Sequence, residues 1–319
     1  GGLAARPGDP PAPLASGVGV VACGASSSAS PAAFSPPHAA FAACRPLSTE
    51  KLRRLGWKRD LPDFRDKTLS LPLEKTSNLP GNIDLREGLQ FPVYEQGDLG
   101  SCTANAIAAA FHYGQLKQGL QDFAPSRLFI YYNERAAEGS VDEDTGAYLR
   151  DGMEALRRVG CCAEALWPYD EAAWRARPPE RCFEAAAESR CKEYARVPQT
   201  LEAMRGCLAE GFPFVLGFVV LASFLAGEEV ERTGRVPMPR PDDYILGGHA
   251  ALACGYDDER RVFILRNSWG PEWGDQGYFY MPYDYMTNSQ LVQDLWAIRV
   301  VDGVDFPTTT AACSVEHAL

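Results

Sequence analysis

The sequence predicts an α+β protein built as two lobes, and three observations support this fold class. Helix patterns recur from Ala104 to Glu210, whereas strand patterns dominate from Phe212 onward, and this order is typical of α+β folds. The 319 residues are enough for one large domain or for two modest lobes that share a cleft. Since 46% of the residues are apolar, a sizeable core can form.

The composition excludes several classes of function. The net charge is −11 and no Lys/Arg cluster occurs, which argues against nucleic-acid and anionic-membrane partners. No run of 18 apolar residues is present, so no membrane span is expected. The ten cysteines form no Cys-x-x-Cys pair and no Cys/His grouping at zinc spacing, so neither a metal nor another cofactor is expected. Their number leaves the disulfide pairing and the redox compartment open.

Composition also divides the chain. Residues 1–50 are rich in Ala, Pro, Ser and Gly, which predicts a disordered tail. Within it, residues 14–25 resemble a signal-peptide core, but no basic leader precedes them, so a low-complexity tail is preferred. Residues 51–80, here called the strap, are charged but contain Trp57, Leu61 and Phe64. They are too short for a domain and form either a strap across the main body or a linker. The main domain follows at 81–305, as a helical lobe (81–195) and a β lobe (196–300), with a tail at 306–319.

Cys102 lies where a loop meets a helix. Residues 96–100 contain two glycines and an aspartate, whereas residues 104–116 strongly favour a helix. The free N–H groups and the dipole at a helix N-terminus favour an anion, and a thiolate is such an anion. Cys102 is therefore a candidate nucleophile, although a buried structural cysteine is the alternative when it is considered alone.

The elements after this helix follow from capping and periodicity. Ser126 is a suitable N-cap for a second helix, and apolar residues at Leu149, Met153 and Leu156 predict an amphipathic one. Residues 161–191 are expected to be irregular. A capped helix at 200–210 then precedes a buried strand at 212–220.

Two strand patterns, at 248–256 and 261–269, flank a turn at 257–260 and predict a β-hairpin. His249 lies nine residues before Asp258 and Asn267 nine after it, so antiparallel pairing brings their side chains within reach. The amide oxygen can then fix the tautomer of the imidazole and leave its other nitrogen to face a cysteine. His112, inside the Cys102 helix, is interpreted as structural, and His38 and His317 receive no role.

Three stretches of this chain resemble the papain family of cysteine peptidases. They are QGDLGSC, which ends at Cys102, then GGHAALACGY around His249, and NSWGPEWGDQGY, which begins at Asn267. The resemblance runs from about Leu79 to Val301. It implies a papain-like fold with a helical N-terminal lobe, an antiparallel β-barrel-like C-terminal lobe and an active-site cleft between them.

The resemblance also implies roles for particular residues. Cys102 is the nucleophile, His249 the general acid/base, Asn267 the residue that orients His249, and Gln96 forms the oxyanion hole with the Cys102 backbone N–H. Trp269 shields the Asn267–His249 hydrogen bond, and Gly146 lets substrate backbone pair closely. Gly248 and Ala250 flank the main specificity pocket, where small residues weakly favour an apolar character. Gln293 or Asp294 can reach the floor of that pocket.

Some positions depart from the family pattern. Thr103 replaces a tryptophan, Leu99 replaces a cysteine that usually forms a disulfide, and Leu85 stands where tryptophan is common. The long helical propeptide is also missing, which resembles bacterial and protist members with a short N-terminal segment. The missing cysteine weakens the case for an oxidising compartment.

The expected function is that of a cysteine endopeptidase which hydrolyses peptide bonds through a thioester acyl-enzyme. Alternatives are a catalytically silent binding or regulatory module on a peptidase scaffold, and acyl transfer to an amine acceptor. The expected partners are protein or peptide substrates and the chain's own strap as an inhibitor lying over or beside the cleft, as in a zymogen, and a monomer is expected. The compartment stays open between an endolysosomal or vacuolar and an intracellular one, and the first residue, a glycine, leaves open that the N-terminus is truncated.

Overall fold

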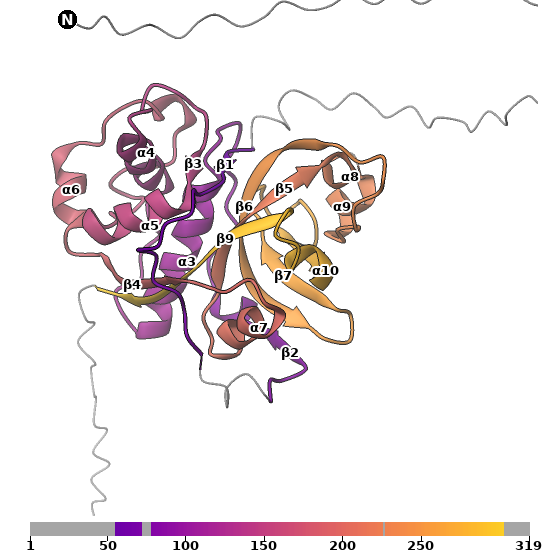
Figure 1. Cartoon of the computed structure of the whole chain (residues 1–319). Helices are drawn as coiled ribbons and strands as arrows, with labels where there is room; N and C mark the ends of the chain where they lie inside the picture. Colours follow the sequence, from indigo (N-terminus) through magenta and orange to yellow (C-terminus); the bar gives the residue numbers. More distant parts are fainter. Residues whose placement is uncertain (1–54, 72–77, 226, 303–319) are drawn as a thin grey trace, which may run out of the picture. The chain divides into compact units, whose positions relative to one another are not determined.

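The computed structural model describes residues 55–71, 78–225 and 227–302. The two predicted tails, at 1–50 and 306–319, lie entirely outside these residues, and so do residues 51–54 and 72–77 of the strap. Figure 1 shows a lobe of helices on one side and a lobe built on a β-sheet on the other, with α3 between them.

The helical lobe contains α3 (Cys102–Gln118), α4 (Arg127–Glu138), α5 (Leu149–Arg158) and α6 (Glu180–Ala186). The alanine-rich α3 is buried along most of its length because it packs against α4, α5 and the sheet. Ser126 caps α4 as predicted, since its Oγ accepts a hydrogen bond of 3.1 Å from the Phe129 N–H. The predicted apolar face of α5 is buried as well.

The expectation for residues 161–191 was incomplete. They contain α6 and a 3-10 turn at Glu171–Ala173, in addition to irregular chain. With only seven residues, α6 is too short to show helical periodicity, and it buries only Cys182 and Ala186.

The sheet lobe is antiparallel and has the strand order β4-β9-β5-β6-β7-β8, with β2 paired to β6. Its strands are β2 (Asn82–Asp84), β4 (Cys191–Arg196), β5 (Phe214–Leu221), β6 (Ile245–Asp257), β7 (Val262–Arg266), β8 (Tyr278–Pro282) and β9 (Val292–Val301). Its helices are α7 (Leu201–Ala209), α8 (Ala222–Leu225), α9 (Glu228–Thr233) and α10 (Tyr283–Met286). The terminal strands β4 and β8 do not pair within the described ranges, so the sheet there is not a closed barrel. β2 joins this sheet although it lies early in the chain.

The sheet separates two hydrophobic cores, and β6 contributes to both. One core surrounds α3, and the other lies among β5–β9 and the short helices of the sheet lobe. From Ala250 to Cys254 alternate residues of β6 enter opposite cores, Ala250, Leu252 and Cys254 on the α3 side and Ala251 and Ala253 on the other. This is the period of two that a strand imposes on its side chains. Because one strand anchors both cores, residues on β6 are held firmly relative to α3.

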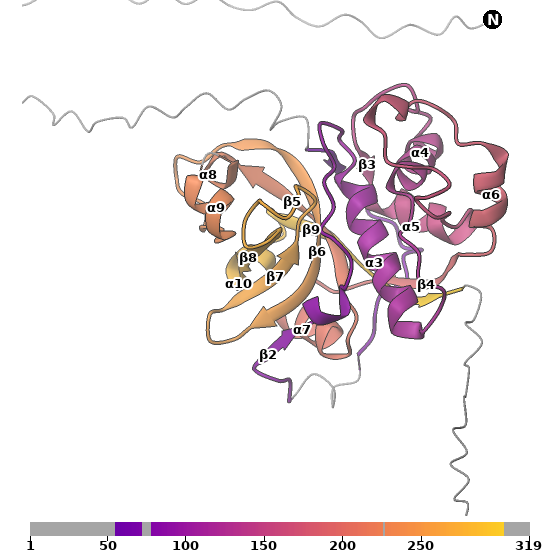
Figure 2. The same cartoon turned by 180° about the vertical axis from the view of Figure 1, so that it is seen from behind.

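The described part of the strap, residues 55–71, crosses the body instead of forming a free linker. In Figures 1 and 2 its indigo ribbon runs between the two lobes. β1 (Trp57–Lys58) pairs in parallel with β3 (Ala147–Tyr148), and further along Leu69 N–H donates to the Arg196 carbonyl at 2.7 Å. Trp57 packs against the α3 core. Leu61 and Phe64, however, are 75% and 98% exposed, so these two of the three apolar residues noted in the strap do not hold it to the body.

Replacing Ser126 tests the cap that sets the start of α4. Ser126→Ala removes both the cap and the 2.7 Å hydrogen bond from its Oγ to the Trp167 carbonyl. We expect the free energy of unfolding to fall by about 1–2 kcal/mol in urea denaturation. Ser140→Ala is the matched control, since the Oγ of Ser140 has no hydrogen-bond partner among the described residues. Equal losses in the two variants would contradict the capping role.

Candidate active site

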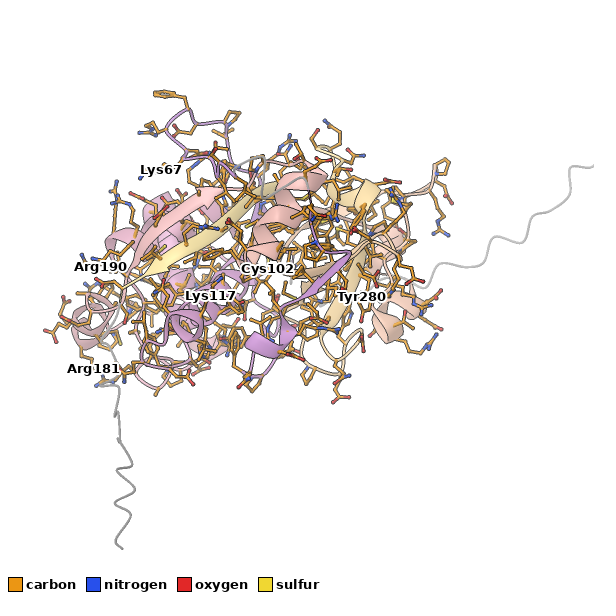
Figure 3. The ribbon with its side chains drawn as sticks, turned by 90° about the horizontal axis from the view of Figure 1, so that it is seen from below. Lys67, Cys102, Lys117, Arg181, Arg190 and Tyr280 are labelled. Carbon is orange, nitrogen blue, oxygen red and sulfur yellow. The ribbon has the colours of Figure 1, made fainter. Side chains whose placement is uncertain are left out.

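Cys102 is the first residue of α3 and is completely buried. Figure 3 shows it near the middle of the molecule, whereas Lys67 of the strap lies at the edge. The preceding residue, Ser101, does not cap α3 with its side chain; its Oγ instead lies 2.6 Å from the Tyr169 hydroxyl. The sequence placed the thiol in the first turn of a helix, and the structure agrees.

Two opposing effects act on the Cys102 thiol. Burial disfavours the thiolate and raises the pKa of Cys102 to about 12, although backbone hydrogen bonds from Gly56, Ala250 and Thr103 act in the opposite direction. These bonds place the sulfur against three segments, namely the strap, β6 and its own helix. In this closed arrangement burial favours the neutral form of the thiol.

His249 lies on β6 and its Nε2 is 2.8 Å from the Asn267 Oδ1. The predicted proximity of these two side chains is therefore present, but the register differs. Leu252 pairs with Arg266, so Asn267 lies two residues from the position opposite His249 and is reached diagonally. The ring of Trp269 lies beside the imidazole, with ring centroids 4.6 Å apart. Both His249 and Asn267 are buried, so water has little access to their hydrogen bond.

The packing of α3 on β6 brings the Cys102 sulfur against the strand that carries His249. Ala250, whose backbone contacts the Cys102 sulfur, is the residue directly after His249. Because α3 and β6 share a core, this contact is held by buried side chains on both elements. The two candidate reacting groups thus come from different lobes.

Gln96 is held in a fixed orientation by its neighbours. Its Nε2 donates to the Leu99 carbonyl at 2.7 Å, and its Oε1 accepts from the Ser268 Oγ at 2.7 Å. Its own backbone N–H donates to the Ser268 carbonyl at 2.9 Å. The side chain is fully buried, next to the segment that carries Asn267. This network fixes which end of the amide carries the N–H donors.

Gly146, Gly248 and Ala250 all face the strap or the thiol. Gly146 has φ of +78°, and a Cβ there would lie 1.8 Å from the Gly56 oxygen. That oxygen accepts a 2.8 Å hydrogen bond from the Ala147 N–H, so strap backbone occupies the position predicted for substrate backbone. A Cβ on Gly248 would lie 2.6 Å from the ring of Trp57.

Charged side chains fasten the rest of the strap to the body. Asp66 accepts from the Arg150 Nε at 3.0 Å and from the Arg196 Nε at 2.5 Å. Asp60 is buried and accepts from the Arg196 Nη2 at 2.8 Å and from the Trp296 indole at 3.1 Å. We call these five residues the latch. Sequence reasoning did not find them, and the signal available was the recurrence of aspartate in an otherwise basic strap.

Positions that depart from the family pattern have their own partners. Thr103 donates through Oγ1 to the buried Glu134 at 2.9 Å and so ties α3 to α4. Burial raises the pKa of Glu134 well above its usual value. His112, for which the sequence showed no partner, lies 2.6 Å from the Asp122 Oδ1 and stacks on Phe91. These contacts agree with a structural role for His112.

Further chemistry was sought throughout the described ranges. The seven cysteines there are buried free thiols, and no cluster of His, Cys, Asp or Glu suitable for a metal occurs among these residues. No helix in the same ranges is long and apolar enough to cross a membrane. A cavity of about 460 Å³ lies between strap residues 63–67, α5 and β4, outside the candidate site.

The sequence profile of the papain family cysteine proteases matches residues 79–296. The chain belongs to this family. An uncharacterized peptidase C1-like protein of Acanthamoeba polyphaga mimivirus is 40% identical over an alignment of 273 residues, which covers 78% of this chain and 88% of the viral protein.

Solved structures agree with the assignment of this chain to the papain family. Xylellain, a cysteine protease from Xylella fastidiosa, is 41% identical, covers 77% of this chain and 96% of its own, and superimposes with a TM-score of 0.74. The proCathepsin B S9 structure from Trypanosoma congolense is 16% identical, with a TM-score of 0.61 over 73% of this chain and 82% of its own. The latter shows similarity of fold alone. The predicted papain-like fold is thereby confirmed, and the family membership supports cysteine peptidase activity.

Loosening the latch tests whether the strap controls access to Cys102. Arg150→Gln removes the ion pair with Asp66 and the 2.6 Å hydrogen bond to the Leu61 carbonyl. Since the pair is partly exposed, we expect the free energy of strap closure to fall by about 1 kcal/mol. Iodoacetamide should then alkylate Cys102 about 5-fold faster, as measured by peptide mapping. Arg158→Gln is the control, because Arg158 pairs within its own helix, with Glu154. An unchanged rate in Arg150→Gln would contradict the role of the latch.

The latch also predicts a dependence on pH. Burial and the nearby Asp294 raise the pKa of Asp60 to about 6, against the opposing charge of Arg196. The closed strap therefore binds this proton more tightly than a free strap, whose ordinary pKa is 3.8. Asp60 contributes its full stabilisation of closure below pH 3.8, and that contribution is lost as the pH rises through about 6. Asp66 behaves oppositely: burial acts to raise its pKa, but Arg150 and Arg196 outweigh burial and lower it, so its contribution is lost only in acid.

We therefore expect the ratio of Cys102 alkylation rates, wild type over Asp60→Asn, to rise about 5-fold between pH 5 and pH 7.5. The ionisation of the thiol itself cancels in this ratio, provided that its pKa is the same in both proteins. A ratio that stays constant with pH would show that Asp60 does not titrate in this range.

Proposed function

We propose that this papain-family chain is a cysteine endopeptidase which uses Cys102, His249 and Asn267, and that the strap keeps it latent. The observation that carries the proposal is the 2.8 Å hydrogen bond between His249 and Asn267, on a strand whose next residue contacts the Cys102 sulfur. The proposal keeps residues 81–305 as the peptidase domain and residues 51–80 as its N-terminal regulatory segment.

The geometry supports a specific proton path. Because Nε2 of His249 is engaged by Asn267, Nδ1 is the nitrogen that exchanges a proton with the Cys102 thiol. The thiolate attacks the scissile carbonyl carbon, and the tetrahedral intermediate expels the amine, which takes its proton from Nδ1. Water then adds to the thioester while Nδ1 accepts its proton, and loss of the thiolate releases the acid. Asn267 holds the imidazole in the tautomer that these steps need.

Gln96 is suited to stabilise the negative oxygen of the intermediate. Its amide nitrogen carries two hydrogens, and the hydrogen bond to the Leu99 carbonyl uses one of them. We infer that this amide and the backbone N–H of Cys102 at the start of α3 pair with the developing oxyanion. Losing one such donor typically lowers the rate about 10²–10³-fold.

The strap marks where substrate binds. Gly56 pairs with the backbone at Gly146 and Ala147, and Trp57 lies against Gly248. In the proposed enzyme these same positions hold peptide substrate, while Trp269 covers the His249–Asn267 hydrogen bond and Ala250 packs beside the thiol. Substrate and strap therefore compete for one cleft, which is the basis of the proposed latency. The proform named for the Trypanosoma congolense relative is consistent with a segment in this role.

Substitution of two of the three proposed catalytic residues, Cys102 and Asn267, tests the function. Cys102→Ala is expected to lower the hydrolysis of a fluorogenic peptide library about 10⁴-fold or more. Asn267→Ala should lower kcat about 10²-fold, because the imidazole loses its orientation but remains present. Cys191→Ala, which removes another buried free thiol, is the control and should retain activity.

Equal rates for wild type and Cys102→Ala would contradict the proposal and favour a silent binding module. Product analysis with an added amine separates hydrolysis from acyl transfer.

A further inference from the structure

Trp57 of the strap fills a pocket whose walls require glycine. A Cβ on Gly217 of β5 would lie 1.9 Å from Cε2 of the indole, and one on Gly248 of β6 would lie 2.6 Å from Cε3. Any larger residue at either position would overlap the ring. The pocket is therefore wide and flat enough for an aromatic side chain. Trp57, which fills it, directly follows Gly56, the strap residue that contacts Cys102.

A carboxylate lies at the far end of this pocket. Asp294 is only 4% exposed, and its Oδ2 accepts hydrogen bonds from the Trp57 Nε1 at 3.1 Å and from the Asp60 N–H at 2.8 Å. Both donors belong to the strap and leave with it. The neighbouring Gln293 does not compete for this place, since its amide donates to the Ser289 carbonyl.

The other oxygen of Asp294 faces the body. Its Oδ1 is 3.3 Å from the Arg196 Nη1, which remains when the strap leaves. Because Arg196 also loses Asp60 and Asp66 at that moment, its charge is left to balance Asp294. In the open protein the charge of Asp294 is thus balanced by Arg196. Its Oδ2 therefore favours a neutral hydrogen-bond donor over a second positive charge.

We propose that this pocket selects substrates with an aromatic side chain that carries a hydrogen-bond donor, tryptophan or tyrosine, and that Asp294 is the residue that determines this selection. The inference rests on the proposed peptidase function and adds its substrate class. A phenylalanine would fill the same space but would leave the nearly buried Oδ2 without a donor, and sites built around a polar partner reject such analogues.

Matched substrates test the proposal in the full chain with Arg150→Gln as the common background, because a closed strap occupies the pocket and this substitution loosens the latch. Peptides are varied at each of the four positions before the scissile bond, with tryptophan against 2-naphthylalanine, tyrosine against phenylalanine, and arginine and leucine for comparison. At one position we expect the donor-bearing member of each pair to have a kcat/KM about 10-fold higher or more. In Asp294→Gly both ratios should fall to within about 2-fold. Glycine is chosen because it adopts the φ of +55° found at position 294.

A second variant covers the case in which Asp294→Gly does not fold. Gly217→Ala places a methyl group where the indole lies, so it should lower kcat/KM for tryptophan relative to leucine by about 10-fold. Asp284→Gly, an exposed carboxylate on α10, is the control for each ratio. Equal rates within each pair in the Arg150→Gln background, ratios unchanged in Asp294→Gly, or a preference for arginine over tryptophan would each overturn the proposal.

A separate measurement distinguishes failure of this inference from failure of the proposed function. Trp57→Phe should speed Cys102 alkylation about 10-fold in the wild-type chain, but no more than about 2-fold in Asp294→Gly, because the hydrogen bond is already absent there. If the chain with Arg150→Gln cleaves no peptide faster than its Cys102→Ala variant, the proposed function fails and this cycle alone decides whether Asp294 selects a donor. Equal effects of Trp57→Phe in the two backgrounds would overturn the inference.

Discussion

The structure depends on a close approach of three backbone segments at Gly56. A Cβ on Gly56 would lie 1.8 Å from the Gly100 oxygen, and one on Gly146 would lie 1.8 Å from the Gly56 oxygen. Side chains at these positions would force the segments apart. Because they are glycines, the strap backbone reaches the start of α3, and both the burial of Cys102 and the position of Trp57 follow from that contact.

The contact of Gly56 with the start of α3 acts on the Cys102 thiol in two opposite ways. Backbone hydrogen bonds from Gly56, Ala250 and Thr103 favour a thiolate, as a helix N-terminus does in general, but burial outweighs them. In the proposed latency, removal of the strap lessens this burial and also removes the hydrogen bond from Gly56. A single extended segment can therefore switch the state of the nucleophile while His249 and Asn267 keep their hydrogen bond.

Local patterns explain how much of the fold and the candidate site could be predicted. The Ser126 cap, the apolar face of α5 and the strands around His249 and Asn267 depend on neighbours in the sequence, and each is present. The hairpin register was two residues off, because Asp257 pairs with Val262 and the turn is therefore centred later than Asp258. The bulge between Ala253 and Gly255 moves the register back by only one residue.

The remaining contacts join residues that are far apart in the chain. Trp57 and Asp294 are 237 positions apart, and Asp60 meets Trp296 across 236. Sequence spacing gives no information on contacts between residues so far apart in the chain. From the sequence alone, the apolar Leu61 and Phe64 therefore stand out, and the aspartates beside them do not. Gly217 left a weak signal, as a lone glycine inside an apolar strand.

The burial of Cys102 has a consequence for oxidation. Peroxides attack the thiolate form of cysteine, and attack also needs access to solvent. The closed chain offers neither at Cys102, because the side chain is fully enclosed and its proton is held tightly. Release of the strap exposes the same sulfur to peptide bonds and to peroxide together. The open protein therefore has a limited lifetime in an oxidising medium, whereas the closed protein can be stored there.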